Sequence, residues 1–170
     1  MNRLNNLEDL FVHELHDLYS AEQQIIAALP KMANAASSPD LRQAFEQHLR
    51  QTRNHVARLD EIFASLNISG NGHECRGMQG LIEEGEQVMK MDGDASVKDA
   101  ALIASAQRVE HYEIAGYGTA RTYAKQLNHD DVADLLQETL DEEGETNKKL
   151  TKLAEGGLLE TGINKQASSM

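Results

Sequence analysis

The chain has 170 residues, of which 40% are apolar, and carries a formal net charge of −12. This length allows one domain with a substantial core, and the negative charge argues against binding to nucleic acid or to anionic membranes. A single cysteine excludes an intramolecular disulfide, and no apolar run reaches the ~18 residues that a membrane span needs. Because the N-terminus also lacks a signal-peptide pattern, we expect a cytoplasmic protein.

Helix-favouring residues dominate the sequence. Aromatic residues make up only 4%, whereas Ala, Leu, Glu, Gln and Lys are abundant, which predicts an all-α fold. The first helix should begin near Asn5 or Asn6 and end ahead of the Ser-Ser-Pro break at residues 37–39. The second serine and the proline of that break are typical of an N-cap and first helical position, and predict a second helix that continues to about Leu66.

A long link separates the second helix from the next long one. It starts with a Gly- and Asn-rich loop at residues 67–75, contains a short amphipathic helix from about Gly77 to Met91, and ends in a turn at residues 92–94. A link of roughly 28 residues can return the chain along a bundle and set the second and third long helices parallel. The pattern therefore predicts a ferritin-like four-helix bundle with a long crossover that contains a short fifth helix.

Two further long helices follow the link. Ser96 with Asp99 resembles a capping box and predicts a third long helix, which runs to a turn at residues 128–129. The fourth long helix should extend from about Asp130 to Ala154. Each of the last two helices is thus bounded by recognisable start and stop signals.

The predicted elements form one domain. We expect the bundle to comprise residues 1–155, because all the long helices lie there. Residues 156–170 are polar and contain glycine, which is typical of a frayed C-terminal tail.

Four glutamates lie on the helix faces that should carry the core. At ~100° per residue, Glu22 falls on the inner face of the first helix and Glu143 on that of the fourth. Glu110 and Glu113 share the inner face of the third helix. A buried carboxylate costs several kcal/mol unless a positive charge neutralises it. Glutamates on the inner faces of separate helices therefore predict a shared cation.

The second helix adds an imidazole to this set. Its inward polar residues are His48 and Thr52, whereas His55 is expected near the margin of the helix face. Three other glutamates are excluded from the set by distance along the helix or by helical phase: Glu14, Glu138 and Glu142. Each long helix thus contributes at least one inward polar group.

The candidate ligands are mainly carboxylates. Oxygen-rich ligation with an imidazole, supplied by facing helices, is typical of a non-haem iron or manganese pair. The four glutamates carry four negative charges, which match two divalent ions. Zinc is disfavoured because the sequence offers no multi-Cys or multi-His set. The predicted metal ligands are Glu22, His48, Glu110, Glu113 and Glu143.

The same residues also have structural interpretations. A single glutamate on an apolar face is more often placed at a helix end or paired with arginine, and a lone core histidine is more often hydrogen-bonded than a ligand. Tyr117 favours packing and hydrogen bonding over a redox role. His73, Glu74 and Cys75 form a polar loop cluster that is typical of a solvated turn.

Several longer stretches of the sequence are distinctive: YSAEQQ at residues 19–24, GLIEE at 80–84, DAALI at 99–103, VEHYEIAGYG at 109–118 and LQETL at 136–140. With these stretches the chain resembles the YciE/YciF family of stress-associated ferritin-like proteins. The likeness covers nearly all of residues 5–155. It implies a four-helix bundle with a long crossover, a homodimer, and a role in general or oxidative stress.

The metal pattern of the wider ferritin-like superfamily is incomplete here. Di-iron members carry Glu-x-x-His on their second and fourth helices, and that motif is absent from this sequence. The second helix instead offers His48 with Thr52, and the fourth offers Thr139 with Glu143. The site is thus a variant metal pair, a single-metal site, or a vestige held by hydrogen bonds.

The sequence leaves two functions open. In the first, the chain is a ferritin-like stress-associated protein that binds one or two iron or manganese ions in the bundle core, and any enzymatic activity would be redox chemistry on oxygen or peroxide. Glu22, Glu113 and Glu143 would be primary ligands. In the second, a non-catalytic bundle acts through its surface or dimer interface, and its inner polar groups satisfy one another.

Overall fold

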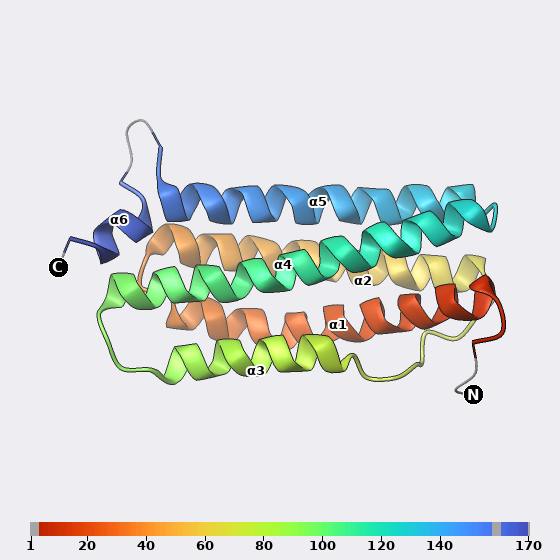
Figure 1. Cartoon of the computed structure of the whole chain (residues 1–170), viewed down its shortest axis with the longest axis horizontal. Coiled ribbons are helices and arrows are strands. Elements are labelled where there is room, and N and C mark those ends of the chain that lie inside the picture. The colour runs from red at the N-terminus through yellow and green to blue at the C-terminus, as the bar shows by residue number, and fades with distance from the viewer. Residues whose placement is uncertain (1–3, 158–160, 170) are drawn as a thin grey trace.

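The computed structural model describes residues 4–157 and 161–169, and these form six helices and one isolated antiparallel bridge between Gly156 and Thr161. Four long helices make the bundle, and the short helix α3 lies beside it (Figure 1). Figure 1 also shows α2 and α4 running in the same direction, as the crossover predicts. Among the described residues, no helix combines the length and the apolar character that crossing a membrane requires.

The first two helices begin and end close to the predicted positions. Helix α1 spans Leu7–Ala35, and the side chain of Asn6 caps it by accepting from the backbone N of Asp9 at 2.8 Å. Helix α2 spans Pro39–Ser65, and Ser38 is its N-cap. A side-chain acceptor at each N-terminus satisfies a backbone N–H that has no partner within the helix.

The short helix α3 spans Arg76–Lys90 and is capped by a buried cysteine. The Sγ atom of Cys75 accepts from the backbone N of Met78 at 3.3 Å and lies 3.1 Å from the hydroxyl oxygen of Tyr112. Its loop neighbours His73 and Glu74 are exposed, as a solvated turn predicts. Cys75, in contrast, is buried and not solvated, because it caps α3 and packs it against the bundle.

The predicted capping box of the third long helix is wrong. Helix α4 spans Ala95–Gln126, and its cap is Asp94, whose side chain accepts from the backbone N of Ser96 at 2.8 Å. Asp99 is buried and instead accepts from the backbone N atoms of Ser37 and Ser38 at 2.8 and 2.7 Å. The free N–H groups of the α1–α2 loop thus compete for this carboxylate, which ties that loop to α4.

The chain ends in two helices that pack together. Helix α5 spans Asp130–Glu155, as predicted, and the short helix α6 spans Ile163–Ala167. Helix α6 contacts α4 and α5, and Ile163 is 5% exposed within the same apolar cluster as Leu150. The described part of the C-terminal segment is therefore packed on the bundle, contrary to the frayed tail expected from its polar composition.

A polar layer divides the apolar core of the described residues. One apolar cluster includes Ile25, Phe45, Leu102 and Leu150, and the other includes Leu18, Leu59, Tyr117 and Leu136. On every long helix, buried polar residues lie near the boundary between the two clusters in sequence: Glu22, His48, Thr52, His55, Glu110, Glu113, Thr139 and Glu143. Two further buried polar residues of α4, Asp99 and Ser105, lie outside this layer. The core of the bundle is therefore apolar at both ends and ionisable in the middle.

Candidate metal centre

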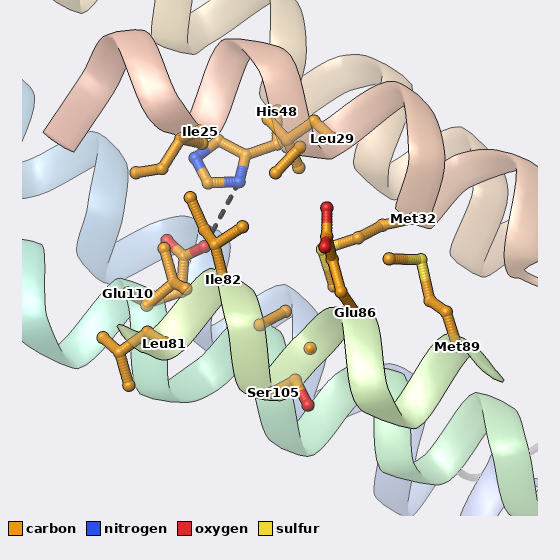
Figure 2. A pocket seen from close by; sticks show the side chains of 14 residues that line it. Ile25, Leu29, Met32, His48, Leu81, Ile82, Glu86, Met89, Ser105 and Glu110 are labelled. Atoms are coloured by element: carbon orange, nitrogen blue, oxygen red, sulfur yellow. Dashed lines mark ion pairs between the residues drawn. The ribbon is translucent and has the colours of Figure 1, made fainter. Parts of the chain in front are cut away.

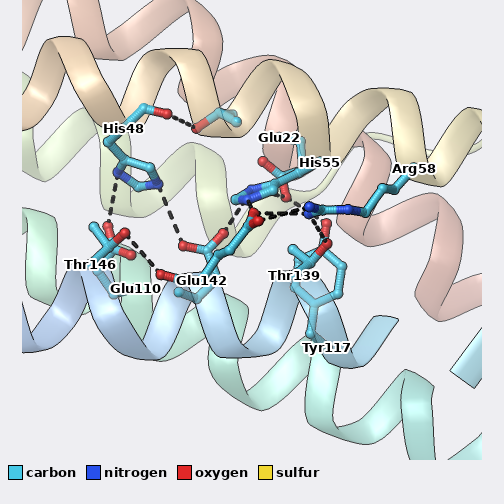
Figure 3. Close-up of polar contacts among 11 residues, drawn as sticks. Glu22, His48, His55, Arg58, Glu110, Tyr117, Thr139, Glu142 and Thr146 are labelled. Atoms are coloured by element: carbon cyan, nitrogen blue, oxygen red, sulfur yellow. Dashed lines mark hydrogen bonds and ion pairs between the residues drawn. The ribbon is translucent and has the colours of Figure 1, made fainter. Parts of the chain in front are cut away.

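The buried polar layer brings together all five residues that the sequence singled out. Glu22, Glu110, Glu113 and Glu143 are each 0% exposed, and His48 is 4% exposed. They come from α1, α2, α4 and α5, and Figure 3 shows several of these side chains converging between the helices. Because helical phase alone predicted inward placement, their burial follows from the amphipathic pattern; ligation itself stays a prediction.

The first group of potential ligands contains one histidine and three glutamates. His48, Glu110, Glu113 and Glu143 each offer one atom, and these four atoms all lie within 4.8 Å of one another. The Nδ1 atom of His48 is 3.2 Å from Oε1 of Glu110, and its Nε2 atom is 3.5 Å from Oε2 of Glu143. Spacing of this kind allows one cation to contact all four side chains.

The second group shares Glu143 with the first. The Nδ1 atom of His55 is 2.9 Å from Oε1 of Glu143 and 3.3 Å from Oε1 of Glu22. One atom from each of these three residues fits the same 4.8 Å limit. Tyr117 orients Glu22 by donating its hydroxyl proton to Oε1 at 2.5 Å. Since opposite oxygens of Glu143 face His48 and His55, its carboxylate can bridge two cations.

Much of the polar layer has no hydrogen-bond partner within the described chain. Both carboxylate oxygens of Glu110, Glu113 and Glu143 are buried and form no hydrogen bond of good geometry, and the same holds for Oε2 of Glu22 and Nε2 of His48; the contacts of Glu110 and Glu143 with the histidines are ion pairs only. Native proteins rarely leave such atoms unsatisfied, because each costs about 1–3 kcal/mol of desolvation. Oxygen and imidazole atoms in this arrangement fit the donor set of a hard or borderline cation.

Burial and neighbouring charges set the protonation of the layer. Burial raises the pKa values of Glu110 and Glu113, and the nearby charge of Glu143 raises them further. Burial also acts to raise the pKa of Glu143, but His48 and His55 outweigh it and hold that pKa below its ordinary value. Burial lowers the pKa of His55, yet Glu143 and Glu22 outweigh burial and raise it to about 10. The raised pKa values mean that a cation competes with protons for Glu110 and Glu113.

His55 belongs to the polar layer, although helical phase did not place it there. It was expected at the margin of the second helix, but its side chain is 0% exposed and lies within the second group. A signal was present, because His48, Thr52 and His55 follow the spacing i, i+4, i+7 and continue the buried face of Leu41 and Leu59. Leu49 and Val56, each one residue after a histidine of this face, are only half-buried.

A polar contact from outside the layer orients His55. Its Nε2 atom is hydrogen-bonded to Oε2 of Glu142 at 2.8 Å, and Arg58 donates to both oxygens of Glu142 at 2.9 and 2.7 Å. Arg58 also donates to Oγ1 of Thr139 at 3.1 Å. Glu142 is not in either group of potential ligands among the described residues. Its contact with the distal imidazole nitrogen is typical of residues that support a metal-binding histidine.

Protonation of His55 predicts a pH-dependent stability for the metal-free protein. The pKa of His55 rises from an ordinary value of 6.5 to about 10 in the folded protein. Protonated His55 therefore contributes its full share to the free energy of unfolding below pH 6.5, and this share is lost as the pH rises through about 10. The raised pKa values of Glu110 and Glu113 also make the protein less stable as the pH rises above 4.5. The lowered pKa of Glu143 has the opposite effect and makes the protein less stable as the pH falls below 4.5. We therefore expect the free energy of unfolding to fall between pH 6.5 and about 10.

Urea unfolding in the presence of a chelator, at about pH 6 and about pH 9, measures this dependence. The variant His55→Gln should show a smaller fall between the two conditions than the wild type. Its matched control is His111→Gln, since His111 is exposed on α4 and should leave the dependence unchanged. Equal pH dependence in the His55→Gln variant and the wild type would contradict the assignment.

Known proteins resemble this chain over most of its length. Residues 6–167 match the family model described as a domain of unknown function, DUF892. Protein YciF of Escherichia coli strain K12 is 46% identical over 163 residues, which cover 95% of this chain and 98% of YciF. The crystal structure of the Escherichia coli stress protein YciF matches with a TM-score of 0.86 at 48% identity, covering 88% of this chain and 95% of that chain.

Two further solved structures are similar to this chain. YcfI from Rhodopseudomonas palustris has a TM-score of 0.87 at 43% identity and covers 90% of this chain and 98% of its own. A dodecameric thioferritin from Bacteroides fragilis has a TM-score of 0.64 at 17% identity, with 86% of this chain and 84% of that chain covered. At that identity the likeness concerns the fold alone, and it confirms the ferritin-like bundle.

Proposed function

This chain belongs to the DUF892 family, and we propose that it binds one or two iron or manganese ions in the buried polar layer. His48, Glu110, Glu113 and Glu143 would hold one ion. Glu22 and His55, with the other oxygen of Glu143, would hold the second. The similarity to the Escherichia coli stress protein YciF supports a stress-associated role for such a site.

The observation that carries this proposal is the position of Glu143. Its carboxylate is fully buried, its two oxygens face the histidines of two different ligand groups, and neither oxygen has a hydrogen-bond partner in the described chain. A carboxylate shared by two oxygen-rich groups is what a pair of hard divalent ions requires.

Iron and manganese fit the donor set better than zinc does. The layer supplies four carboxylates and two imidazoles, and it contains no thiolate. Bound iron or manganese would supply one-electron redox chemistry at this position. The chain itself would exclude water through the two apolar clusters, hold Glu22 through Tyr117, and hold His55 through Glu142.

Metal analysis of protein purified from iron- or manganese-supplemented cells tests the proposal. We expect the wild type to contain up to two ions per chain, and Glu143→Gln to lose stoichiometric metal, because this substitution removes the charge shared by both groups. The matched control is Glu145→Gln on the same helix, where the glutamate is exposed and pairs with Lys148. This control should retain the metal content of the wild type.

A well-folded wild type without stoichiometric metal would contradict the proposal. That outcome would favour the second function expected from the sequence, in which a metal-free bundle acts by contact with a partner. In that case Glu143, His48 and His55 would form a structural ion-pair network, supported by Glu142 and Arg58. Circular dichroism on the same samples separates loss of metal from loss of fold.

A further inference from the structure

A small cavity lies between α1, α3 and α4, next to the candidate metal centre. Its volume is about 30 Å³, and its walls are almost entirely apolar. The side chains that form most of the walls are Ile25, Leu29, Met32, Leu81, Ile82 and Met89. Helix α3, the crossover helix, therefore covers a hollow in the bundle and does not fill it completely.

Two of the predicted metal ligands form the inner wall of this cavity. His48 and Glu110 line it, and Nε2 of His48 and both oxygens of Glu110 have no hydrogen-bond partner in the described chain. Glu86 lies on the opposite side with Met32 and Met89 (Figure 2), and it forms an ion pair with Lys31 at 2.7 Å. Since Glu86 and Lys31 are partly exposed, the cavity extends from the α1–α3 surface toward the ligands.

The size of the cavity limits what it can hold. A volume of 30 Å³ accommodates about two water-sized molecules, whereas organic substrates need pockets on the order of 300–1,000 Å³. A buried water requires two to four polar partners, and the apolar walls supply none along most of the cavity. A small nonpolar molecule loses no hydrogen bonds on entering such a space.

We propose that this cavity admits a small nonpolar molecule of the size of dioxygen to the His48–Glu110 side of the candidate metal centre. The functional meaning of this site rests on the proposed metal binding, because only a metal ion there would give dioxygen a reaction partner. Larger solutes would be excluded by size, and polar solutes by the walls. Helix α3 would thus determine which molecules reach the polar layer.

Gly85 provides a variant that fills the cavity, and Gly80 provides its control. Gly85 lines the cavity on α3, and a Cβ atom added there would meet only the Cβ of Ser105, at 3.8 Å. Gly80 lies on the same helix, is exposed, and has no atom within 4 Å of an added Cβ among the described residues. Gly85→Leu should therefore occupy the cavity, whereas Gly80→Leu makes the same chemical change on the surface.

Methyl NMR relaxation of the metal-free, full-length protein under dioxygen pressure tests the proposal directly. Dissolved dioxygen is paramagnetic, so the methyl groups of Ile25 and Ile82 should relax faster than that of the exposed Val97 in the wild type and in Gly80→Leu. Gly85→Leu should lose this enhancement. If Gly85→Leu does not fold, Gly85→Val should lose most of it. Wild-type cavity methyls that relax no faster than Val97 would overturn the proposal.

Metal analysis of the same three proteins separates this inference from the proposed function. We expect all three to bind metal equally, because Gly85 and Gly80 are not in either ligand group. If the protein binds metal but dioxygen does not speed methyl relaxation at the cavity, only the proposal about the cavity is overturned. If dioxygen speeds methyl relaxation at the cavity but the protein binds no metal, the proposed function is overturned, and with it the role of the cavity in supplying a metal centre.

Discussion

Glu113→Leu is expected to raise the free energy of unfolding of the metal-free protein by about 1–3 kcal/mol. The side chain of Glu113 is 0% exposed, and neither of its oxygens has a hydrogen-bond partner in the described chain. Its pKa is raised by burial and by the neighbouring carboxylates, which favours an uncharged but still unpaired polar group. Leucine has a similar size and removes that desolvation cost. Urea unfolding at neutral pH with a chelator measures the change.

The control for Glu113→Leu is the same substitution at an exposed glutamate. Glu145 on α5 is largely exposed, and Glu145→Leu should change the free energy of unfolding by no more than about 0.5 kcal/mol. Added metal should reverse the order of stability between the wild type and Glu113→Leu, because only the wild type retains the complete first group. A clear loss of stability in metal-free Glu113→Leu would show that Glu113 has a stabilising partner after all.

Glu143→Leu is expected to have the opposite effect and to lower the free energy of unfolding by about 3–5 kcal/mol. Glu143 lies between His48 and His55, at 3.5 and 2.9 Å, and these contacts hold its pKa below the ordinary value. Removing the carboxylate leaves a buried, protonated His55 with only Glu22 and Glu142 to balance it. Breaking a buried ion pair costs more than the pair contributes, because one charge stays desolvated.

Comparison of the two leucine variants is more informative than either alone. Glu113 and Glu143 have the same side chain and the same exposure of 0%, so burial by itself predicts equal effects. Partner geometry predicts opposite signs, because only Glu143 lies between two imidazoles. Thermal or urea unfolding of both metal-free variants under one condition measures the difference. Stabilisation by Glu143→Leu would show that the histidines do not neutralise that carboxylate.

Local signals predicted most of the fold. Asn6 and the serine before Pro39 marked two helix starts correctly, because an N-cap depends on residues within one turn of each other. The length of the link predicted the parallel arrangement of α2 and α4. Asp99 was misassigned because two N–H groups from a distant loop compete for its carboxylate. A contact between segments about 60 residues apart cannot be deduced from local spacing.

The candidate site likewise has features that the sequence predicted and features that it did not. Helical phase predicted that Glu22, Glu110, Glu113 and Glu143 face inward, and all four are buried. It failed for His55, because a small drift of the helical period moves the centre of the buried face by one residue over several turns. The pattern also did not identify the partners of Glu143.

The amino-acid sequence by itself determined the helices, their apolar faces and the presence of ionisable residues on those faces. These properties depend on residues within a few turns of one another, and the period of 3.6 residues relates them directly to the sequence. Only the tertiary structure decided that Glu143 lies between His48 and His55, that Glu113 has no hydrogen-bond partner among the described residues, and that α3 leaves a cavity beside Glu110. These contacts depend on the rotation and axial position of each helix against its neighbours, which are set by the packing of the whole core.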